Sequence, residues 1–420
     1  MPRKRPPPIP TVSDSLQLRQ WSSLQPLLQR SLEHSLFQRS RLAASFSDID
    51  SFDAFVRLVP LTQKTELALD QAAHPLYGSN QTEHPARYTR FCQTSGTTAR
   101  PLAVWDTEES WAWLLENWCH GYALAGVTPG MVAFFAFSFG PFLGFWTAFE
   151  AGLRMGLRCI PGGGLGTAAR LNAILEHRVE VLCCTPTYAL HLARAARESG
   201  LDLSQSWVRK ILVAGEPGGS LPAVRSQLAQ AWPHAEVIDH YGMTEVGPVA
   251  FGASAAPAAL RLLEERYFAE VLDVSGQPVR DGQTGELVLT PLGRSSWPLF
   301  RYQTGDLVRP RRGPAGLELE GGILGRIDDM VIVRGVNLYP GAIEEVVRSV
   351  PEIAEYRVNV IGGAGLAELL VEVEAGPTKG VAVPLEAAFE RAFSLRIPVR
   401  EVALGSLPRF ELKSHRWVRG

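Results

Sequence analysis

Cysteine is scarce in this chain, and its pattern excludes two kinds of structure. No two cysteines form a C-x-x-C pair, and the second half of the chain has none; the five are Cys92, Cys119, Cys159, Cys183 and Cys184. An odd count without framework spacing argues against a disulfide scaffold and against a structural zinc site, and it indicates a reducing compartment. We therefore expect a cytoplasmic protein whose thiols are small buried side chains.

Strong net charge and long apolar runs are also missing. The formal net charge of -2 gives no overall attraction for nucleic acid or for an anionic membrane, so neither partner is expected. The most apolar run, residues 131–149, is rich in Phe and Gly and only marginally long enough to span a membrane, so we interpret it as buried core or pocket wall. No apolar stretch follows the basic residues 1–8, which excludes a signal peptide and predicts a disordered tail over residues 1–15.

The chain does contain a strand–helix alternation. A length of 420 residues predicts two or more domains. Between residues 91 and 252, apolar strand-like runs alternate with helical stretches, which is typical of a mainly parallel sheet covered by helices. We predict an α/β fold with a large N-terminal domain of helix-flanked, largely parallel sheets (1–327) and a small mobile α+β domain (328–420). The oligomeric state stays open, with a homodimer among the possibilities.

One polar segment has the composition of a phosphate-binding loop. Residues 94–101, TSGTTARP, place hydroxyl groups around a glycine, so that O–H and backbone N–H donors can surround phosphate oxygens. The candidate ligands are Ser95, Gly96, Thr97, Thr98 and Arg100. The segment is not a Walker loop, which needs G-x-x-x-x-G-K-[ST]. Taken alone, it is equally well explained as an exposed polar loop.

Two further segments follow apolar strands, where a parallel sheet places its ligand-binding loops. They are GEP (215–217) and HYGMTE (240–245). The ring of Tyr241 can stack on a purine, and the Glu245 carboxylate can bind Mg²⁺, which prefers hard oxygen ligands and phosphate partners. Each segment by itself is also explained as an ordinary turn at the end of a strand.

The last candidates lie in YQTGD (302–306), GRIDD (325–329) and the basic C-terminal LPRFELKSHR (407–416). The Asp306 carboxylate suits the two hydroxyls of a ribose, and Arg326 suits ribose or phosphate oxygens. A turn with a surface ion pair and a solvated tail explain the same residues when each segment is taken alone.

In their order along the chain, these segments resemble the core motifs of the adenylate-forming superfamily of acyl-CoA synthetases, adenylation domains and luciferases. The resemblance covers residues 90–416 and is greatest to the phenylacetate–coenzyme A ligase branch. It implies an ATP-dependent enzyme with Mg²⁺ and coenzyme A as cofactors. Such an enzyme converts a small carboxylic acid to an acyl-adenylate and then to a thioester. The aromatic residues 134–146 indicate an aromatic acid, with Phe139 and Phe142 as candidate pocket residues beside Gly215 and Tyr241.

The resemblance also implies a role for each motif residue. The phosphate-loop candidates are then ATP ligands, Gly215, Glu216 and Pro217 line the adenine pocket with Tyr241 and Gly242, and Thr244 lies at the α-phosphate. Glu245 is the Mg²⁺ ligand, Asp306 and Arg326 hold the ribose, Lys413 is the catalytic lysine, Asp328 is the hinge, and Gly335 faces the thiol tunnel.

Two positions depart from the family pattern. Ala99 and Arg100 stand where Gly-Lys is usual, and Leu412 stands where Gly precedes the lysine. Arginine keeps the charge but not the geometry of an ammonium group. Four alternatives remain open: a carrier-protein phosphopantetheine as acceptor, an amine as acceptor, transfer of AMP to a deazaflavin phenol, and, because of these two departures, a nucleotide-binding homologue with weakened catalysis.

Overall fold

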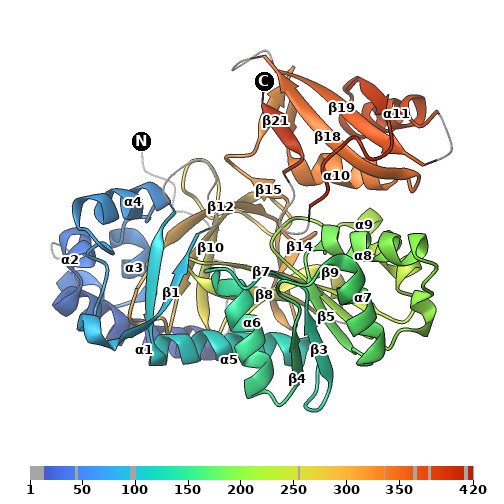
Figure 1. Cartoon of the computed structure of the whole chain (residues 1–420). Coiled ribbons are helices and arrows are strands. Elements are labelled where there is room, and N and C mark those ends of the chain that lie inside the picture. Colours follow the sequence, from blue (N-terminus) through green and yellow to red (C-terminus); the bar gives the residue numbers. More distant parts are fainter. Residues whose placement is uncertain are drawn as a thin grey trace.

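The computed structural model describes residues 14–42, 46–94, 101–253, 256–334, 336–362, 367–376, 380–410 and 415–419. Its described strands form sheets covered by helices, with a smaller unit on one side of a large one (Figure 1). The predicted α/β fold class is confirmed. Phosphate-loop residues 95–100, Gly335, Leu412 and Lys413 lie outside the described residues.

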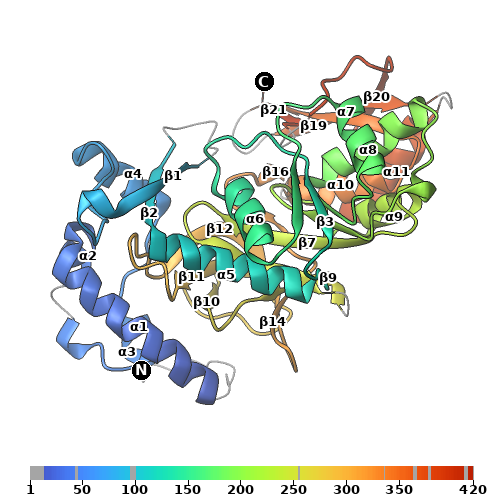
Figure 2. The ribbon, with the colours of Figure 1, turned by 60° about the horizontal axis from the view of Figure 1, so that its bottom comes forward.

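The N-terminal region is helical and lies at one end of the large domain (Figures 1 and 2). Its helices are α1 (Asp14–His34), α2 (Leu36–Leu42), α3 (Phe52–Leu58) and α4 (Lys64–Ala73), with a 3-10 turn at Phe46–Asp48. Their apolar faces enclose a small core that includes Leu24, Leu28 and Phe55 together with Phe300. Because Phe300 lies just before a strand of the large domain, this core attaches the helical region to the sheets.

A nine-stranded sheet forms the centre of the large domain, in the order β13-β14-β9-β8-β7-β6-β5-β3-β4. Its strands are β3 (Val132–Phe135), β4 (Arg158–Pro161), β5 (Val181–Cys184), β6 (Lys210–Val213), β7 (Glu236–Met243), β8 (Gly247–Ala253), β9 (Ala256–Leu262), β13 (Pro310–Gly313) and β14 (Gly316–Glu320). The five neighbouring strands β4, β3, β5, β6 and β7 run parallel to one another. On the other side of β7, the strands β8, β9, β14 and β13 pair antiparallel in turn. The parallel part matches the predicted alternation, whereas the antiparallel part follows a change of direction at β8.

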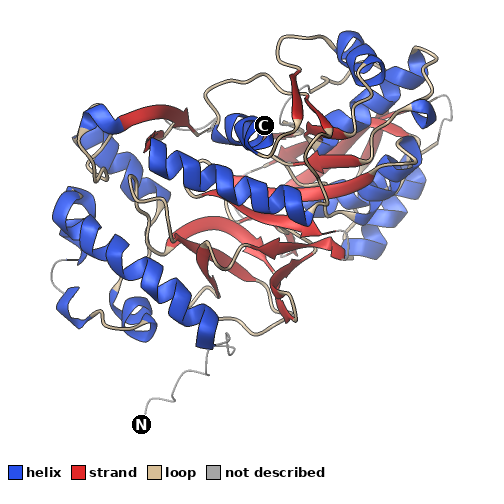
Figure 3. Ribbon diagram, turned by 90° about the horizontal axis from the view of Figure 1, so that it is seen from below, coloured by secondary structure: helices blue, strands red, loops and turns tan. Residues whose placement is uncertain are grey.

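Helices cover both faces of the parallel strands (Figure 3). They are α5 (Glu108–Leu124), α6 (Leu143–Arg154), α7 (Thr167–Glu176), α8 (Pro186–Glu198) and α9 (Pro222–Ala231). Successive residues of β3 point to opposite faces: Ala133 and Phe135 belong to the core with α5 and α6, and Val132 and Phe134 to the core with α7, α8 and α9. A strand buried on both sides gives a continuous apolar run, which explains residues 131–137 without a membrane segment. No described helix is long and apolar enough to cross a membrane.

Two smaller sheets complete the large domain. A hairpin of β1 (Tyr88–Gln93) and β2 (Ala103–Thr107) brackets the phosphate-loop segment. An antiparallel sheet consists of β10 (Tyr267–Leu272), β11 (Gly285–Pro291), β12 (Tyr302–Val308) and β15 (Gly325–Arg326), and short 3-10 turns occur at Pro85–Arg87 and Leu203–Gln205.

The C-terminal unit has a separate apolar core. Its elements are β16 (Val331–Val333), β17 (Val336–Leu338), α10 (Pro340–Arg348), β18 (Ile353–Ile361), β19 (Glu368–Ala375), α11 (Ala382–Phe393), β20 (Val399–Val402) and β21 (Trp417–Arg419). The last four strands form one sheet in the order β20-β19-β18-β21, and α10 packs near α9 of the large domain (Figure 1). A domain boundary between residues 327 and 328 stays a prediction. All five cysteines are free, and Cys92, Cys183 and Cys184 are buried.

Candidate active site

Tyr241, Asp306 and Arg326 come from three different strands and meet in one hydrogen-bonded group. The Tyr241 hydroxyl donates to Oδ2 of Asp306 at 2.6 Å, and Nη1 of Arg326 donates to Oδ1 of the same carboxylate at 3.2 Å. Asp306 and Arg326 are cross-strand partners in β12 and β15, which fixes their register. Burial raises the pKa of Tyr241 well above its ordinary value, and the Asp306 charge raises it further, so the phenol stays a neutral donor. The group therefore places a carboxylate, which can accept hydrogen bonds from hydroxyls, and a guanidinium, which can donate to oxygen atoms, beside an aromatic ring.

Glu245 lies on the loop that follows β7 and is 5% exposed. Its Oε1 accepts a hydrogen bond from the Tyr302 hydroxyl at 3.3 Å and pairs with Nζ of Lys64 at 3.0 Å. A buried carboxylate that faces a lysine ammonium has the charge and the oxygen donor that a divalent cation requires. Glu245 therefore offers one carboxylate ligand to a divalent cation, no cluster of three or more such side chains occurs among the described residues, and the Mg²⁺ site stays a prediction.

A buried ion pair holds the backbone on which Thr244 and Glu245 lie. Arg294 binds both carboxylate oxygens of Asp106, at 2.7 Å from Nε and 2.5 Å from Nη2, and both side chains are 0% exposed. The remaining Nη1 donates to the backbone carbonyls of Thr244 at 2.7 Å and Glu245 at 3.0 Å. Because Asp106 lies on β2, this arginine connects the hairpin around the phosphate-loop segment to the Glu245 loop.

The ends of the phosphate-loop segment are closed by Thr94 and Leu102. The N–H of Thr94 donates to the Leu102 carbonyl at 3.1 Å, and the N–H of Leu102 donates to Oγ1 of Thr94 at 3.0 Å. The Thr244 hydroxyl donates to the carbonyl of Gln93, the residue before Thr94, at 3.4 Å. The segment that contains Ser95, Gly96, Thr97, Thr98 and Arg100 therefore begins and ends beside Thr244, although those residues themselves lie outside the described part of the chain.

The predicted adenine loop lies at the end of β6. Gly215 has a φ of +92°, a conformation that favours glycine. Oε1 of Glu216 accepts a hydrogen bond from the Thr187 N–H at the start of α8, at 2.9 Å, and Pro217 follows on the exposed surface. At the end of β7, a Cβ on Gly242 would lie 2.7 Å from the Gly247 carbonyl oxygen, so only glycine fits there.

The predicted acid-pocket residues lie in an aromatic cluster at the carboxyl end of β3. The Phe139 ring contacts Phe137, Trp146 and Phe149 at centroid distances of 5.2, 5.2 and 5.3 Å. Phe142 precedes α6 and contacts Phe145 at 5.8 Å. Both Phe139 and Phe142 are partly buried. Since the N–H of Gln93 donates to the Pro141 carbonyl at 2.8 Å, this cluster adjoins the phosphate-loop segment.

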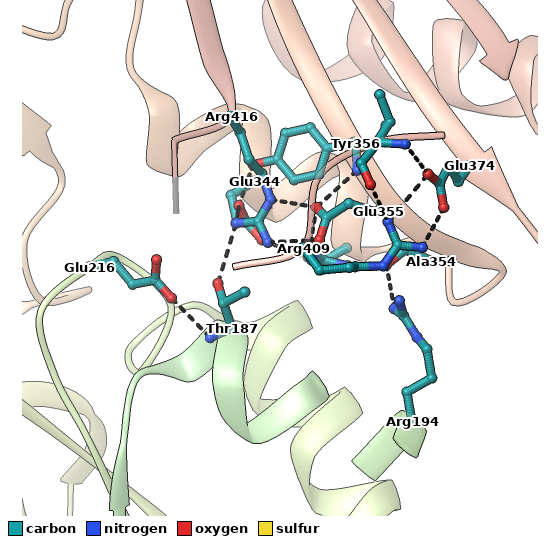
Figure 4. A network of polar contacts seen from close by, with 12 residues as sticks. Thr187, Arg194, Glu216, Glu344, Ala354, Glu355, Tyr356, Glu374, Arg409 and Arg416 are labelled. Atoms are coloured by element: carbon teal, nitrogen blue, oxygen red, sulfur yellow. Dashed lines mark hydrogen bonds and ion pairs between the residues drawn. The ribbon is translucent and has the colours of Figure 1, made fainter. Parts of the chain in front are cut away.

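The small domain contacts the large domain next to the adenine loop (Figure 4). Arg416 is buried, with Nε at 2.6 Å from Oε1 of Glu355 and Nη1 at 3.3 Å from Oε2 of Glu344. The same Nη1 donates to Oγ1 of Thr187 at 3.3 Å, and Thr187 donates through its N–H to Glu216. A chain of polar contacts thus runs from the adenine loop to a residue three positions after Lys413.

Further contacts hold the two domains in this arrangement. The N–H of Ala223, at the start of α9, donates to both carboxylate oxygens of Glu345 at 3.1 Å. Gln227 donates to the Arg348 carbonyl at 2.7 Å, and Arg194 donates to the Ala354 carbonyl. Asp328, the predicted hinge, has a largely exposed side chain that pairs with Nη2 of Arg326 at 3.4 Å.

His240 precedes Tyr241 and is enclosed by aromatic rings. Its ring centroid lies 4.2 Å from that of Trp118 and 4.4 Å from that of Phe251. Within the described structure neither ring nitrogen has a hydrogen-bond partner. Burial lowers the pKa of His240 to about 3. The imidazole is therefore a neutral core side chain rather than a proton donor or a metal ligand.

This environment predicts an acid sensitivity. Because the folded-state pKa of His240 lies below the unfolded value near 6.5, the unfolded chain binds the additional proton between these values, and stability falls as the pH falls through that window. We expect this group to lower the free energy of unfolding by about 2 kcal/mol at pH 5 relative to pH 8. Urea unfolding of wild type and His240→Phe at both pH values measures the effect. Equal pH slopes for the two proteins would contradict it.

Sequence reasoning did not identify Lys64, Asp106, Arg294 or Thr187 as parts of the site. These residues lie outside the recognised motifs, and their partners are far away in the sequence. No local sequence pattern around any of the four indicates a ligand.

Comparison with known proteins gives matches over most of the chain. Residues 43–291 match the family model described as AMP-binding enzyme, and residues 335–419 match the AMP-binding enzyme C-terminal domain. The chain is 31% identical over 333 residues to a phenylacetate-coenzyme A ligase of Thermus thermophilus, which covers 75% of this chain and 71% of the relative. It is 28% identical over 428 residues to a phenylacetate-coenzyme A ligase of Pseudomonas putida, which covers 97% and 95%.

Solved structures of one ligase resemble this chain in two different states. A crystal structure of 2-hydroxyisobutyryl-CoA ligase in the postadenylation state has a TM-score of 0.92 and 25% identity, and covers 100% of this chain and 95% of that one. The same ligase with coenzyme A in the thioesterification state has a TM-score of 0.73 and 26% identity, and covers 97% and 90%. The present domain arrangement is therefore similar to the postadenylation state. Because the first family model alone matches more than half of the chain, the protein belongs to the AMP-binding enzyme family, the adenylate-forming acyl-CoA ligases.

Proposed function

We propose that the protein activates a small aromatic carboxylic acid with ATP and transfers the acyl group to the thiol of coenzyme A. The observation that supports this most directly is the hydrogen-bonded group of Tyr241, Asp306 and Arg326. It combines an aromatic ring, a carboxylate for two ribose hydroxyls and a cation. Glu245 and Thr244 follow Tyr241 on the same strand and loop, at the place where the phosphates of a nucleotide held by this group would extend.

The first step is attack of a carboxylate oxygen of the acid on the α-phosphorus of ATP. An O–P bond forms, the bond from the α-phosphorus to the bridging oxygen breaks, and pyrophosphate leaves. No protein nucleophile is needed, because AMP serves as the leaving group in the second step. The chain's residues orient the reactants and neutralise the negative charge that develops on the α-phosphate.

We assign these tasks to residues on both domains. Thr244 lies at the α-phosphate, and Lys413 from the small domain supplies positive charge there. Ser95, Gly96, Thr97, Thr98 and Arg100 bind the phosphates further along. When bound at Glu245, Mg²⁺ supplies additional positive charge to the phosphates.

In the second step the coenzyme A sulfur attacks the acyl carbon, a C–S bond forms, and the bond to the AMP oxygen breaks. The thiol proton passes to solvent. We propose that the small domain first rotates about Asp328, which withdraws Lys413 and brings Gly335 to the thiol. The two states named for the similar 2-hydroxyisobutyryl-CoA ligase, with TM-scores of 0.92 and 0.73 to this chain, support a change of domain arrangement.

The aromatic preference rests on the cluster around Phe139 and Phe142. These partly buried rings follow β3 and adjoin the phosphate-loop segment through the Gln93–Pro141 hydrogen bond. Flat apolar rings in this position favour a flat apolar acid over a charged or strongly polar one.

Acid-dependent exchange of labelled pyrophosphate into ATP, measured over a panel of aryl and aliphatic acids, tests the proposal. We expect exchange with aryl acids, and acyl-CoA formation when coenzyme A is added. Exchange with aliphatic acids alone would contradict the aromatic preference. Exchange without thioester formation would select a carrier protein, an amine or a phenol as the acceptor, and ATP binding without exchange for any acid would indicate the catalytically weakened homologue.

A further inference from the structure

Lys64 is the first residue of α4, and its ammonium group reaches the predicted cation ligand from a part of the chain that none of the recognised motifs includes. Its Nζ lies 3.0 Å from Oε1 of Glu245. We propose that Lys64 is a further ATP-binding residue, which contacts the β- and γ-phosphate oxygens when nucleotide is bound. The proposal rests on the function proposed above and assigns one additional residue to the same site.

The backbone that presents Lys64 is held against the strand that bears other site residues. Thr62 donates through its N–H to the Arg301 carbonyl at 2.9 Å, and its own carbonyl accepts from the Gln303 N–H at 2.9 Å. The Thr62 hydroxyl donates to the Phe300 carbonyl at 2.7 Å. Since Tyr302 and Asp306 lie on the same strand, β12, the start of α4 keeps a fixed distance from the nucleotide-binding group.

Local contacts also define where α4 begins. The N–H of Gln63 donates to Oε2 of Glu66 at 2.7 Å, which is half of a capping box. Arg41 pairs with Glu66 and donates to the Leu61 carbonyl at 2.8 Å. With the backbone fixed in this way, only the flexible side chain of Lys64 has to move when the contents of the site change.

The exposure of the two partners shows that their pair is a poor stabilising contact but a suitable ligand-binding one. The Lys64 side chain is 46% exposed, whereas that of Glu245 is 6% exposed. A half-solvated ion pair contributes little to folding. A lysine that borders solvent can instead turn toward an incoming polyanion, because its ammonium has three donors on a flexible stem.

The charges around Glu245 explain how the Lys64 side chain is placed with and without bound nucleotide. Without nucleotide, the Lys64 ammonium balances the charge of the buried Glu245 carboxylate. A divalent cation that binds Glu245 takes over this role, and the ammonium becomes available to the phosphates. Segment 94–101 contributes one cationic residue, Arg100, against a triphosphate with several negative charges. Lys64, beside Glu245, supplies a second one.

Binding measurements on Lys64→Met test the proposal without relying on turnover. We expect the variant to bind ATP about 10- to 100-fold more weakly than wild type, as for loss of one charge-assisted hydrogen bond. The loss should be larger with Mg²⁺ than after its removal with a chelator, because the cation at Glu245 frees the ammonium for the phosphates. AMP, which lacks the β- and γ-phosphates, should bind with unchanged affinity, and Lys64→Arg should recover part of the ATP affinity.

A matched control is Lys210→Met. Lys210 also pairs with a glutamate, Glu236 at 2.6 Å, but at the opposite ends of the parallel strands, so this variant should leave the binding of both nucleotides unchanged. Two results would overturn the proposal: unchanged ATP affinity in Lys64→Met, or equal losses for ATP and AMP. If the wild-type protein bound neither ATP nor AMP, the proposed function itself would be refuted. Titration of the wild-type protein with the two nucleotides distinguishes this outcome from a failure of the Lys64 proposal.

Discussion

Replacing Lys413 by alanine is expected to slow acyl-adenylate formation by about 10²- to 10³-fold, the usual effect of removing one group that stabilises a transition-state oxyanion. Thiolysis of a supplied acyl-adenylate should stay near the wild-type rate, because the proposed domain rotation withdraws Lys413 before that step. Single-turnover pyrophosphate release and acyl-CoA formation from synthetic adenylate measure the two steps separately. The prediction combines the motif assignment with the anchoring of the neighbouring residues Arg409 on Glu374 and Arg416 on Glu355.

Two variants make this result specific. Lys413→Arg keeps the positive charge and should retain more adenylation activity than the alanine variant, although not all of it, since a planar guanidinium does not replace a compact ammonium. Lys210→Ala removes a lysine of the large domain far from the strand-end loops and should affect neither step. Adenylation by Lys413→Ala at the wild-type rate, or an equal loss in both steps, would show that the assigned role is wrong.

Arg294→Met is expected to lower the free energy of unfolding by about 3–5 kcal/mol, because it leaves the Asp106 carboxylate buried without its counter-charge. The same change removes the donor shared by the carbonyls of Thr244 and Glu245. We therefore also expect slower adenylation in protein that is still folded. Urea unfolding monitored by tryptophan fluorescence measures the first effect, and pyrophosphate exchange under native conditions measures the second.

The double variant Arg294→Met/Asp106→Leu separates charge from architecture. With both charges removed, much of the stability should return, since a buried ion pair can often be replaced by apolar residues of similar size. Adenylation should remain slow, because the carbonyls of Thr244 and Glu245 still lack their donor. A double variant as unstable as the sum of its two single variants, or one with wild-type adenylation, would contradict this account.

Periodicity alone predicted the strand–helix alternation of the parallel part of the fold, although not α6, β4 or α9. The apolar run that became β3 is buried on both faces, so its composition and its structure agree without help from distant residues. The change to antiparallel pairing after β7 was not predicted. Strand direction depends on which distant segments pair, and the sequence around β8 has the same apolar character that a parallel strand has.

The sequence by itself predicted the motif residues of the nucleotide site, through the order of the motifs along the chain rather than through any one of them. Tyr241, Asp306 and Glu245 were identified in this way, and the structure brings Tyr241 and Asp306 within 2.6 Å. Only the tertiary structure revealed Lys64, and the clamp formed by Asp106 and Arg294. Lys64 contacts Glu245, and Asp106 contacts Arg294, in each case a residue far away in the sequence. No local pattern records such a contact. A lysine at the start of a helix or a buried arginine has no evident function until folding places its partner beside it.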